Sequence, residues 1–221
     1  FITLVVTGFA LKFPDSWFST LLGMSEKVRG VTHRIAGVVL IGIGVYHLVY
    51  VARTRDGRRL LLDFLPAPKD ATDAWGIMLY YLGLRSEKPE FRRFNYAEKA
   101  EYWALVWGMI VMAVTGVMLW AKVLVGNHMP RWWLDVATAI HFYEAVLATL
   151  AIIVWHFYQV FFDPDVYPMN WAWWDGKMTL HHYQDEHGLD TTVIAAPADE
   201  PIPGEAAAED EPVVTGVEHG E

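Results

Sequence analysis

Four histidines lie inside long apolar segments, where an imidazole is costly unless it faces the interior of a helix bundle and has a partner. His47 follows His33 at position i+14 of one segment, and His156 follows His141 at position i+15 of another. At 100° per residue, the two spacings return to within about 40° and about 60° of the same helix face. With a rise of 1.5 Å per residue, each pair is separated by roughly 21–23 Å along its helix. Each segment therefore carries one histidine towards each end.

This arrangement is suited to holding two haem groups at different depths of a membrane. A haem iron takes axial ligands from opposite sides, and imidazole supplies both of them without cysteine. We expect His33 and His141 to bind one b-type haem, and His47 and His156 to bind a second. A metal-ion transporter would need histidines clustered at one depth, which these spacings do not provide. The competing interpretation is that the histidines are polar packing residues in a protein without haem.

An internal repeat supports the pairing of histidines across the two segments. The triplet Val-Thr-Gly at residues 6–8 recurs at residues 114–116, an offset of 108. Both histidines of the first segment recur in the second, at offsets of 108 and 109. The chain is therefore expected to form two similar helical hairpins. Because the second and fourth helices then run in the same direction, their matched histidines lie at matched depths.

The elements that must position these histidines are membrane helices. Apolar residues make up 54% of the 221 residues and charged residues 19%, below the roughly 25% typical of globular chains. A bilayer core needs about 20 residues of helix, and the first apolar run is shorter than that. We expect it to belong to a membrane helix that begins before Phe1. The sequence predicts an all-α, four-helix membrane bundle with helices at about 1–13, 31–51, 102–124 and 136–162.

The polar parts of the chain complete this architecture. Residues 1–178 are expected to form the membrane domain, in which an amphipathic stretch, Ala71–Leu84, lies on the cytoplasmic membrane surface. Residues 179–221 are expected to be a polar tail, disordered beyond about residue 190 because alanine, glutamate and proline dominate there. Ten of the 17 basic residues fall within 53–99, so the positive-inside rule places that loop and the tail in the cytoplasm. The charge pattern gives no support for nucleic-acid binding.

Three motifs in these segments match a known family of membrane proteins. The segment 91–103, FRRFNYAEKAEYW, resembles a motif at the start of a helix in the formate dehydrogenase gamma-subunit family. HRIAG at 33–37 is similar to the second-helix histidine motif of that family, and His141 and His156 match its fourth helix. The histidine spacings also resemble those of cytochrome b in bc and b6f complexes. The resemblance covers most of residues 1–178 and implies a dihaem cytochrome b of the bacterial inner (plasma) membrane.

The resemblance leaves one haem ligand open. In the family, the first helix carries a haem ligand near its cytoplasmic end. The ligand opposite His156 is therefore either His47, whose spacing mirrors that of the other pair, or a residue upstream of Phe1.

The resemblance also implies a quinone site beside the cytoplasmic-side haem, with menaquinone or ubiquinone as the mobile carrier. The asparagine of the family motif, which forms a hydrogen bond with the quinone, corresponds to Asn95, and Lys99 lies near it. Asparagine is also a preferred helix N-cap, and Asn95 precedes an apolar run. Capping is therefore the alternative role for Asn95.

Charged residues near the histidines have two interpretations each. Arg34, with Arg29 and Lys27, lies at the outer end of the second helix and either pairs with haem propionates or extends to the lipid headgroups. Glu144 lies one turn after His141, where it orients that ligand, relays protons, or serves as a paired structural acid.

The expected function is electron transfer across the membrane between a quinone pool on the cytoplasmic side and a redox partner at the outer face. The chain has no cysteine, so the partner must supply iron–sulfur clusters or c-type haems. We assign no catalytic residue, because the haems carry the electrons. One alternative is a self-contained transmembrane reductase of the cytochrome b561 type. The other is a haem-free membrane anchor or transport protein.

Overall fold

The computed structural model describes residues 1–162 continuously, followed by residues 167, 169, 171, 174, 177–179, 183, 187–190 and 213–215. It consists of two units, one made of residues 1–61 and 103–153 and the other of residues 62–102 and 154–221. We describe each unit by itself. Apart from residues 179, 183, 187–190 and 213–215, the tail predicted from residue 179 onward lies outside the described residues.

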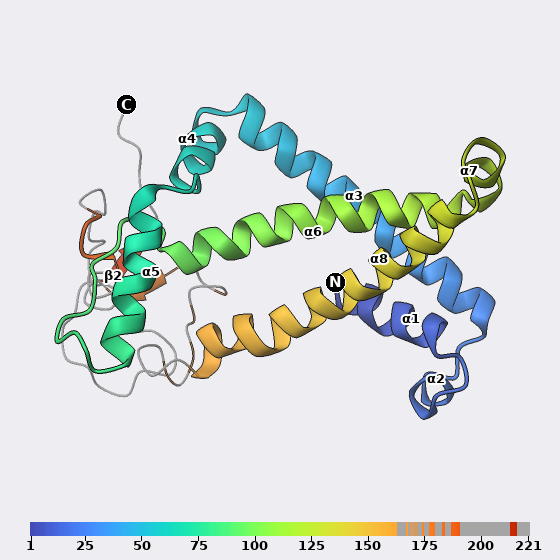
Figure 1. The fold of residues 1–221 in the computed structure, drawn as a ribbon, viewed down its shortest axis with the longest axis horizontal. Helices are drawn as coiled ribbons and strands as arrows, with labels where there is room; N and C mark the ends of the chain where they lie inside the picture. The colour runs from blue at the N-terminus through green and yellow to red at the C-terminus, as the bar shows by residue number, and fades with distance from the viewer. Residues whose placement is uncertain are drawn as a thin grey trace. The chain divides into compact units, whose positions relative to one another are not determined.

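Apart from one short strand pair, the regular elements of the described residues are all helices, which confirms the predicted all-α class (Figure 1). The helices are α1 (Ile2–Lys12), α2 (Trp17–Leu21), α3 (Glu26–Arg53), α4 (Arg55–Asp63), α5 (Pro68–Tyr81), α6 (Tyr96–Trp120), α7 (Lys122–His128) and α8 (Trp132–Leu150). Wide π-helical turns, η1 (Ala151–His156) and η2 (Tyr158–Phe162), continue α8. Strand β1 (Lys177–Thr179) pairs antiparallel with β2 (Val213–Thr215).

Three of the described helices are long and apolar enough to cross a membrane. They are α3, α6 and α8 with its π-helical continuation, which have 28, 25 and 31 residues. Large apolar side chains on all three are exposed, as expected for surfaces that face lipid; Val38, Leu105 and Leu147 are examples. The first apolar run forms α1, which has 11 residues in this chain and is shorter than a membrane span.

All three membrane helices begin earlier than hydropathy predicts, and polar side chains cap two of them. Helix α3 begins five residues before the predicted Val31, after Ser25, whose hydroxyl accepts a hydrogen bond from the Val28 N–H at 3.4 Å. Helix α6 begins six residues before the predicted Tyr102, after Asn95. A cap satisfies an N–H that the first helical turn leaves without a partner. The predicted third helix is also divided, since its last residues belong to α7.

Helix α1 packs along the first part of α3 in the first unit (Figure 1). Thr7 and Ala10 of α1 are buried in this contact, with 2% and 0% of their surface exposed. The ring of Phe142 on α8 contacts the ring of Phe13 edge to face, with a centroid distance of 5.9 Å. Residues of α1, α3 and α8 therefore meet around the buried face of α1.

The second unit contains α5 and the beginning of α6. Helix α5 covers most of the predicted amphipathic stretch, and its first turn is fixed by Asp70, whose Oδ2 accepts a hydrogen bond from the Ala67 N–H at 2.6 Å. Gly83 follows α5 with a φ of 70°, which glycine adopts without steric cost. The ring of Phe64 stacks on Tyr102 of α6, with a centroid distance of 4.3 Å.

Candidate functional site

Two threonine–histidine pairs lie in the first unit and repeat the same geometry. The Oγ1 of Thr7 on α1 lies 3.0 Å from Nδ1 of His33 on α3. The Oγ1 of Thr115 on α6 lies 2.8 Å from Nδ1 of His141 on α8. Both threonines precede their histidines by 26 residues. The repeat in the sequence therefore corresponds to a repeated contact between helices.

The hydrogen bonds of the two threonines determine which nitrogen of each imidazole carries the proton. A hydroxyl has one proton to donate. Thr7 Oγ1 donates to the Thr3 carbonyl at 2.6 Å, and Thr115 Oγ1 donates to the Val111 carbonyl at 2.7 Å. Each oxygen can therefore only accept from its histidine, so the proton lies on Nδ1. The Nε2 lone pair is left available to bind a metal, as in sites where a second-shell group fixes the histidine tautomer.

A glycine next to each threonine makes room for the imidazole. A Cβ added to Gly8 would lie 3.1 Å from Cε1 of His33, and a Cβ added to Gly116 would lie 3.2 Å from Cε1 of His141. Both distances are shorter than ordinary carbon–carbon contacts. Each ring therefore lies against the helix backbone at its glycine, which accounts for the Val-Thr-Gly triplet in both hairpins.

The two imidazoles of the first histidine pair, His33 and His141, lie at a distance suited to one shared metal ion. Their ring centroids are 6.3 Å apart and their planes are inclined by 73°. Two imidazoles bound on opposite sides of one ion, each at about 2 Å, place their centroids about 6–6.5 Å apart. The donor set, the tautomers and this spacing fit an iron with two axial histidines, as in a haem.

The second histidine pair, His47 and His156, is divided between the two units. His47 is half-buried on α3 in the first unit. His156 ends η1 in the second unit, where its Nδ1 lies 3.4 Å from Oε2 of Glu101. Wide π-helical turns rotate less per residue than α-helical turns, which reduces the offset of about 60° expected between His141 and His156. That His47 and His156 share a haem stays a prediction.

Comparison with known families identifies the protein class. A family model described as prokaryotic cytochrome b561 matches residues 1–168, about three quarters of the chain. The chain belongs to the prokaryotic cytochrome b561 family. A comparison with curated protein sequences gives no match. Membership confirms the membrane cytochrome b expected from the motifs, and cytochromes of this family bind b-type haem and act in electron transfer.

In this cytochrome b561 family member, Asn95 caps α6. Its Oδ1 accepts hydrogen bonds from the N–H groups of Ala97 and Glu98 at 2.8 and 2.9 Å, and Glu98 Oε2 accepts from the Asn95 N–H at 2.8 Å. This reciprocal arrangement is a capping box. The cap uses the amide oxygen of Asn95. Among the described residues, none accepts a hydrogen bond from its Nδ2. The amide nitrogen therefore stays available as a donor, and the predicted quinone contact is compatible with the cap.

Lys99, the second residue expected near quinone, forms an ion pair with Asp70 at an N–O distance of 2.9 Å. Burial raises the pKa of the Asp70 carboxyl, but the hydrogen bonds from Lys99 and from the Ala67 N–H, with the charges of Lys99 and Lys69, lower it below its usual value. The ion pair therefore stabilises the fold above the ordinary aspartate pKa. This contribution is lost as the pH falls through the pKa of the folded state.

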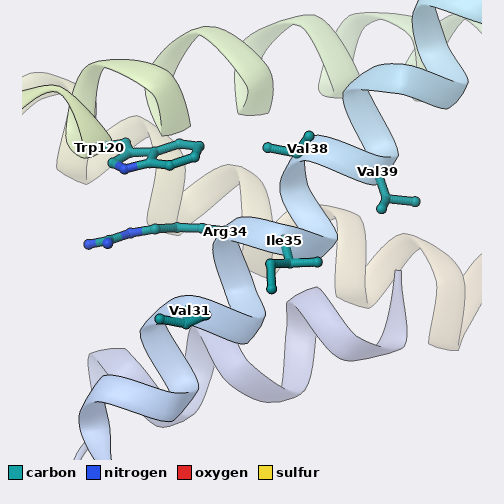
Figure 2. Close-up of a pocket in the computed structure, with 6 residues that line it drawn as sticks. All are labelled: Val31, Arg34, Ile35, Val38, Val39 and Trp120. Carbon is teal, nitrogen blue, oxygen red and sulfur yellow. The ribbon is translucent and has the colours of Figure 1, made fainter.

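Arg34 lies on the exposed face of α3, where its guanidinium is 5.8 Å from the centre of the Trp120 ring. Figure 2 shows the two side chains extending beside each other in a pocket that Val31, Ile35, Val38 and Val39 also line. A cation over an aromatic face is attracted by the ring electrons. Arg34 therefore has a partner of its own on α6, and its predicted contact with a haem propionate stays untested.

The structure also gives contacts for Glu144 and for the tail histidine His187. A Cβ added to Gly108 would lie 2.9 Å from Glu144 Oε1, so the Glu144 carboxyl fills the space beside the α6 backbone. Nδ1 of His187 lies 2.8 Å from the Arg92 carbonyl oxygen. Within the described residues, no group of three or more histidine, cysteine or acidic side chains forms a metal site. The two histidines at positions 181 and 182 lie outside the described residues.

The threonines of the two pairs are candidate site residues that sequence reasoning did not assign. The Val-Thr-Gly repeat is evident in the sequence. A threonine in a helix commonly forms a hydrogen bond to its own backbone, so its presence alone does not indicate a functional role. The signal that identifies Thr7 and Thr115 is their common separation of 26 residues from His33 and His141.

Proposed function

We propose that this cytochrome b561 family member binds two b-type haems and transfers electrons across the membrane. It does so between a quinone pool on the cytoplasmic side and a redox partner at the outer face that carries iron–sulfur clusters or c-type haems. The observation that carries the proposal is the first histidine pair. His33 and His141 come from different hairpins, have matching tautomers, and lie at the spacing of two axial ligands.

The residues of the chain position the groups between which electrons move. Each haem supplies an iron that accepts and releases one electron. His33 and His141 would hold one haem near the outer face, and Thr7 and Thr115 would keep both rings in the binding tautomer and orientation. His47 and His156 would hold the second haem towards the cytoplasmic face, since His47 follows His33 by about 21 Å along its helix.

The quinone site lies where α6 begins, at the cytoplasmic membrane boundary given by the positive-inside rule. Asn95 donates from Nδ2 to a quinone carbonyl while its Oδ1 maintains the helix cap. Lys99 and Asp70 hold α5 against this boundary through their ion pair. Three observations support this site. Asn95 belongs to the family motif, its Nδ2 is not used by the helix cap, and it lies at the beginning of a candidate membrane helix.

Replacing the threonines tests the first histidine pair without removing a ligand. Valine has the shape of threonine but accepts no hydrogen bond, so Thr7→Val and Thr115→Val leave Nδ1 of His33 and His141 without an acceptor. Loss of such second-shell partners weakens metal binding by about 10- to 100-fold. We expect the double variant to release one haem faster on dilution into apomyoglobin, and Thr138→Val, an exposed threonine of α8, to behave as wild type. Release equal to wild type in the double variant would contradict the assigned tautomers.

Variants of Asn95 separate the cap from the quinone contact. Asn95→Asp keeps an oxygen for the helix cap but replaces the Nδ2 donor by an acceptor, which repels a quinone carbonyl. We expect it to slow haem oxidation by a quinone analogue in stopped flow by about tenfold or more, with little change in thermal stability. Asn95→Ala is expected to slow the reaction and to cost about 1 kcal/mol of stability as well. If Asn95→Asp keeps wild-type kinetics, Asn95 is a cap without quinone contact.

The self-contained reductase of the cytochrome b561 type remains the second candidate, because the family description itself is that of a b561 cytochrome. The purified chain in liposomes distinguishes the two. Our proposal predicts haem reduction by a quinol analogue and little transfer to external ferric chelates until an outer redox partner is added. Sustained ferric reduction by the chain alone would favour the reductase.

A further inference from the structure

Arg29 is a buried cation whose partners are incomplete. It lies near the beginning of α3 with 6% of its surface exposed. Its Nη1 donates to the Ala10 carbonyl of α1 at 3.0 Å, but its Nε has no hydrogen-bond partner and its guanidinium forms no ion pair within the described residues. Arginine keeps its charge at every physiological pH. A buried charge is strongly unfavourable without an opposite charge, so this position requires an anion.

Arg29 lies close to His33 of the first histidine pair. Arg29 precedes His33 by four residues, which puts both on one face of α3, about 6 Å apart along the helix. On α1, Ala10 follows Thr7 by three residues, so the Arg29–Ala10 contact is the layer next to the Thr7–His33 contact. The unsatisfied guanidinium therefore lies one helical turn from the proposed haem ligand His33, towards the beginning of α3.

We propose that Arg29 binds a propionate carboxylate of the haem held by His33 and His141. This inference rests on the proposed function. Haem carries two propionates on one edge, and a guanidinium forms short charge-assisted hydrogen bonds with a carboxylate. A hydrogen bond with a propionate oxygen would give Arg29 Nε the partner that α1 does not supply. Arg34 differs from Arg29, because it is exposed and already lies over the Trp120 ring.

The positive charge of Arg29 has a consequence for the redox potential. Oxidation of the iron adds one positive charge to the haem, and a neighbouring guanidinium disfavours it. Arg29 therefore raises the midpoint potential of the first haem. In a variant that lacks the charge, that potential falls while the potential of the second haem stays unchanged.

The test compares the full chain loaded with haem and with haem dimethyl ester, whose propionates carry no charge. With haem, Arg29→Gln is expected to lose the first haem about ten- to a hundredfold faster than wild type and to lower its midpoint potential. With the dimethyl ester, wild type and Arg29→Gln should lose it at similar rates. Arg53→Gln is the control from the same helix, because Arg53 is exposed in the last turn of α3, and it should lose the first haem at the wild-type rate with both groups. If Arg29→Gln does not fold, Arg29→Lys, which keeps the charge without the planar fork, is compared in the same way.

Equal effects of the substitution with both groups would overturn the proposal, because Arg29 would then act through helix packing or a lipid phosphate. Unchanged release and potential with haem would also overturn it. Failure of the proposed function is distinguishable from either outcome, since it appears in the wild-type chain as the absence of a haem that depends on His33 and His141.

Discussion

His33→Ala and His141→Ala should each halve the haem content of the protein and leave the second haem in place. On our proposal, either substitution removes one of the two histidines that would hold one haem. The remaining imidazole then becomes an unpaired polar group within a membrane bundle. The two rings lie 6.3 Å apart, as expected for ligands of one haem. Loss of either ligand is therefore expected to have the same effect on haem content.

The measurement is haem per chain by pyridine haemochrome, together with the spectrum of the remaining haem. His128→Ala is a suitable control, because His128 is exposed on α7 and its Nδ1 lies near the Leu124 carbonyl of its own helix. It should retain the full haem content. A full haem content in either His33→Ala or His141→Ala would show that the two residues do not form one haem site.

His156→Ala should remove the other haem and leave the one that depends on His33 and His141. His47→Ala should do the same if His47 is the ligand opposite His156, as the similar spacings of the two histidine pairs along their helices suggest. The double variant His33→Ala with His156→Ala should contain no haem, since the two sites are independent. The spectra of the single variants then give each haem its own absorption and midpoint potential.

A wild-type haem content in His156→Ala would reject the second site as we propose it. Loss in His156→Ala but not in His47→Ala would show that another residue, and not His47, completes the site. Glu101→Gln is an informative companion, because the Glu101 carboxylate lies 3.4 Å from Nδ1 of His156. A carboxylate partner makes a histidine ligand more basic, so this variant should raise the midpoint potential of the second haem.

Much of the fold follows from the sequence, because a bilayer requires long uninterrupted apolar helices. Hydropathy alone located α3, α6 and α8. It misplaced the beginnings of α3 and α6 because the caps at Ser25 and Asn95 are polar and extend each helix beyond its apolar run. The π-helical turns after α8 were not predictable, since they depend on a shift of backbone hydrogen bonds that no residue type marks.

The candidate site was predictable where it depends on periodicity and repetition. The common offset of the internal repeat pairs His33 with His141, and the structure places their rings 6.3 Å apart, while their binding of one haem stays a prediction. The roles of Thr7 and Thr115 required the structure, because they depend on the direction of a hydroxyl hydrogen bond. The cap at Asn95 was one of two alternatives in the sequence, and the structure shows that it forms while leaving Nδ2 available.

The central claim is that one chain holds two b-type haems, and the most direct test is a redox titration of the purified full chain with haem and protein quantified in the same sample. The account predicts a b-type reduced-minus-oxidised spectrum, two haems per chain and two one-electron steps, of which one disappears in His33→Ala. A single haem per chain, or a spectrum without b-type absorption, would contradict it.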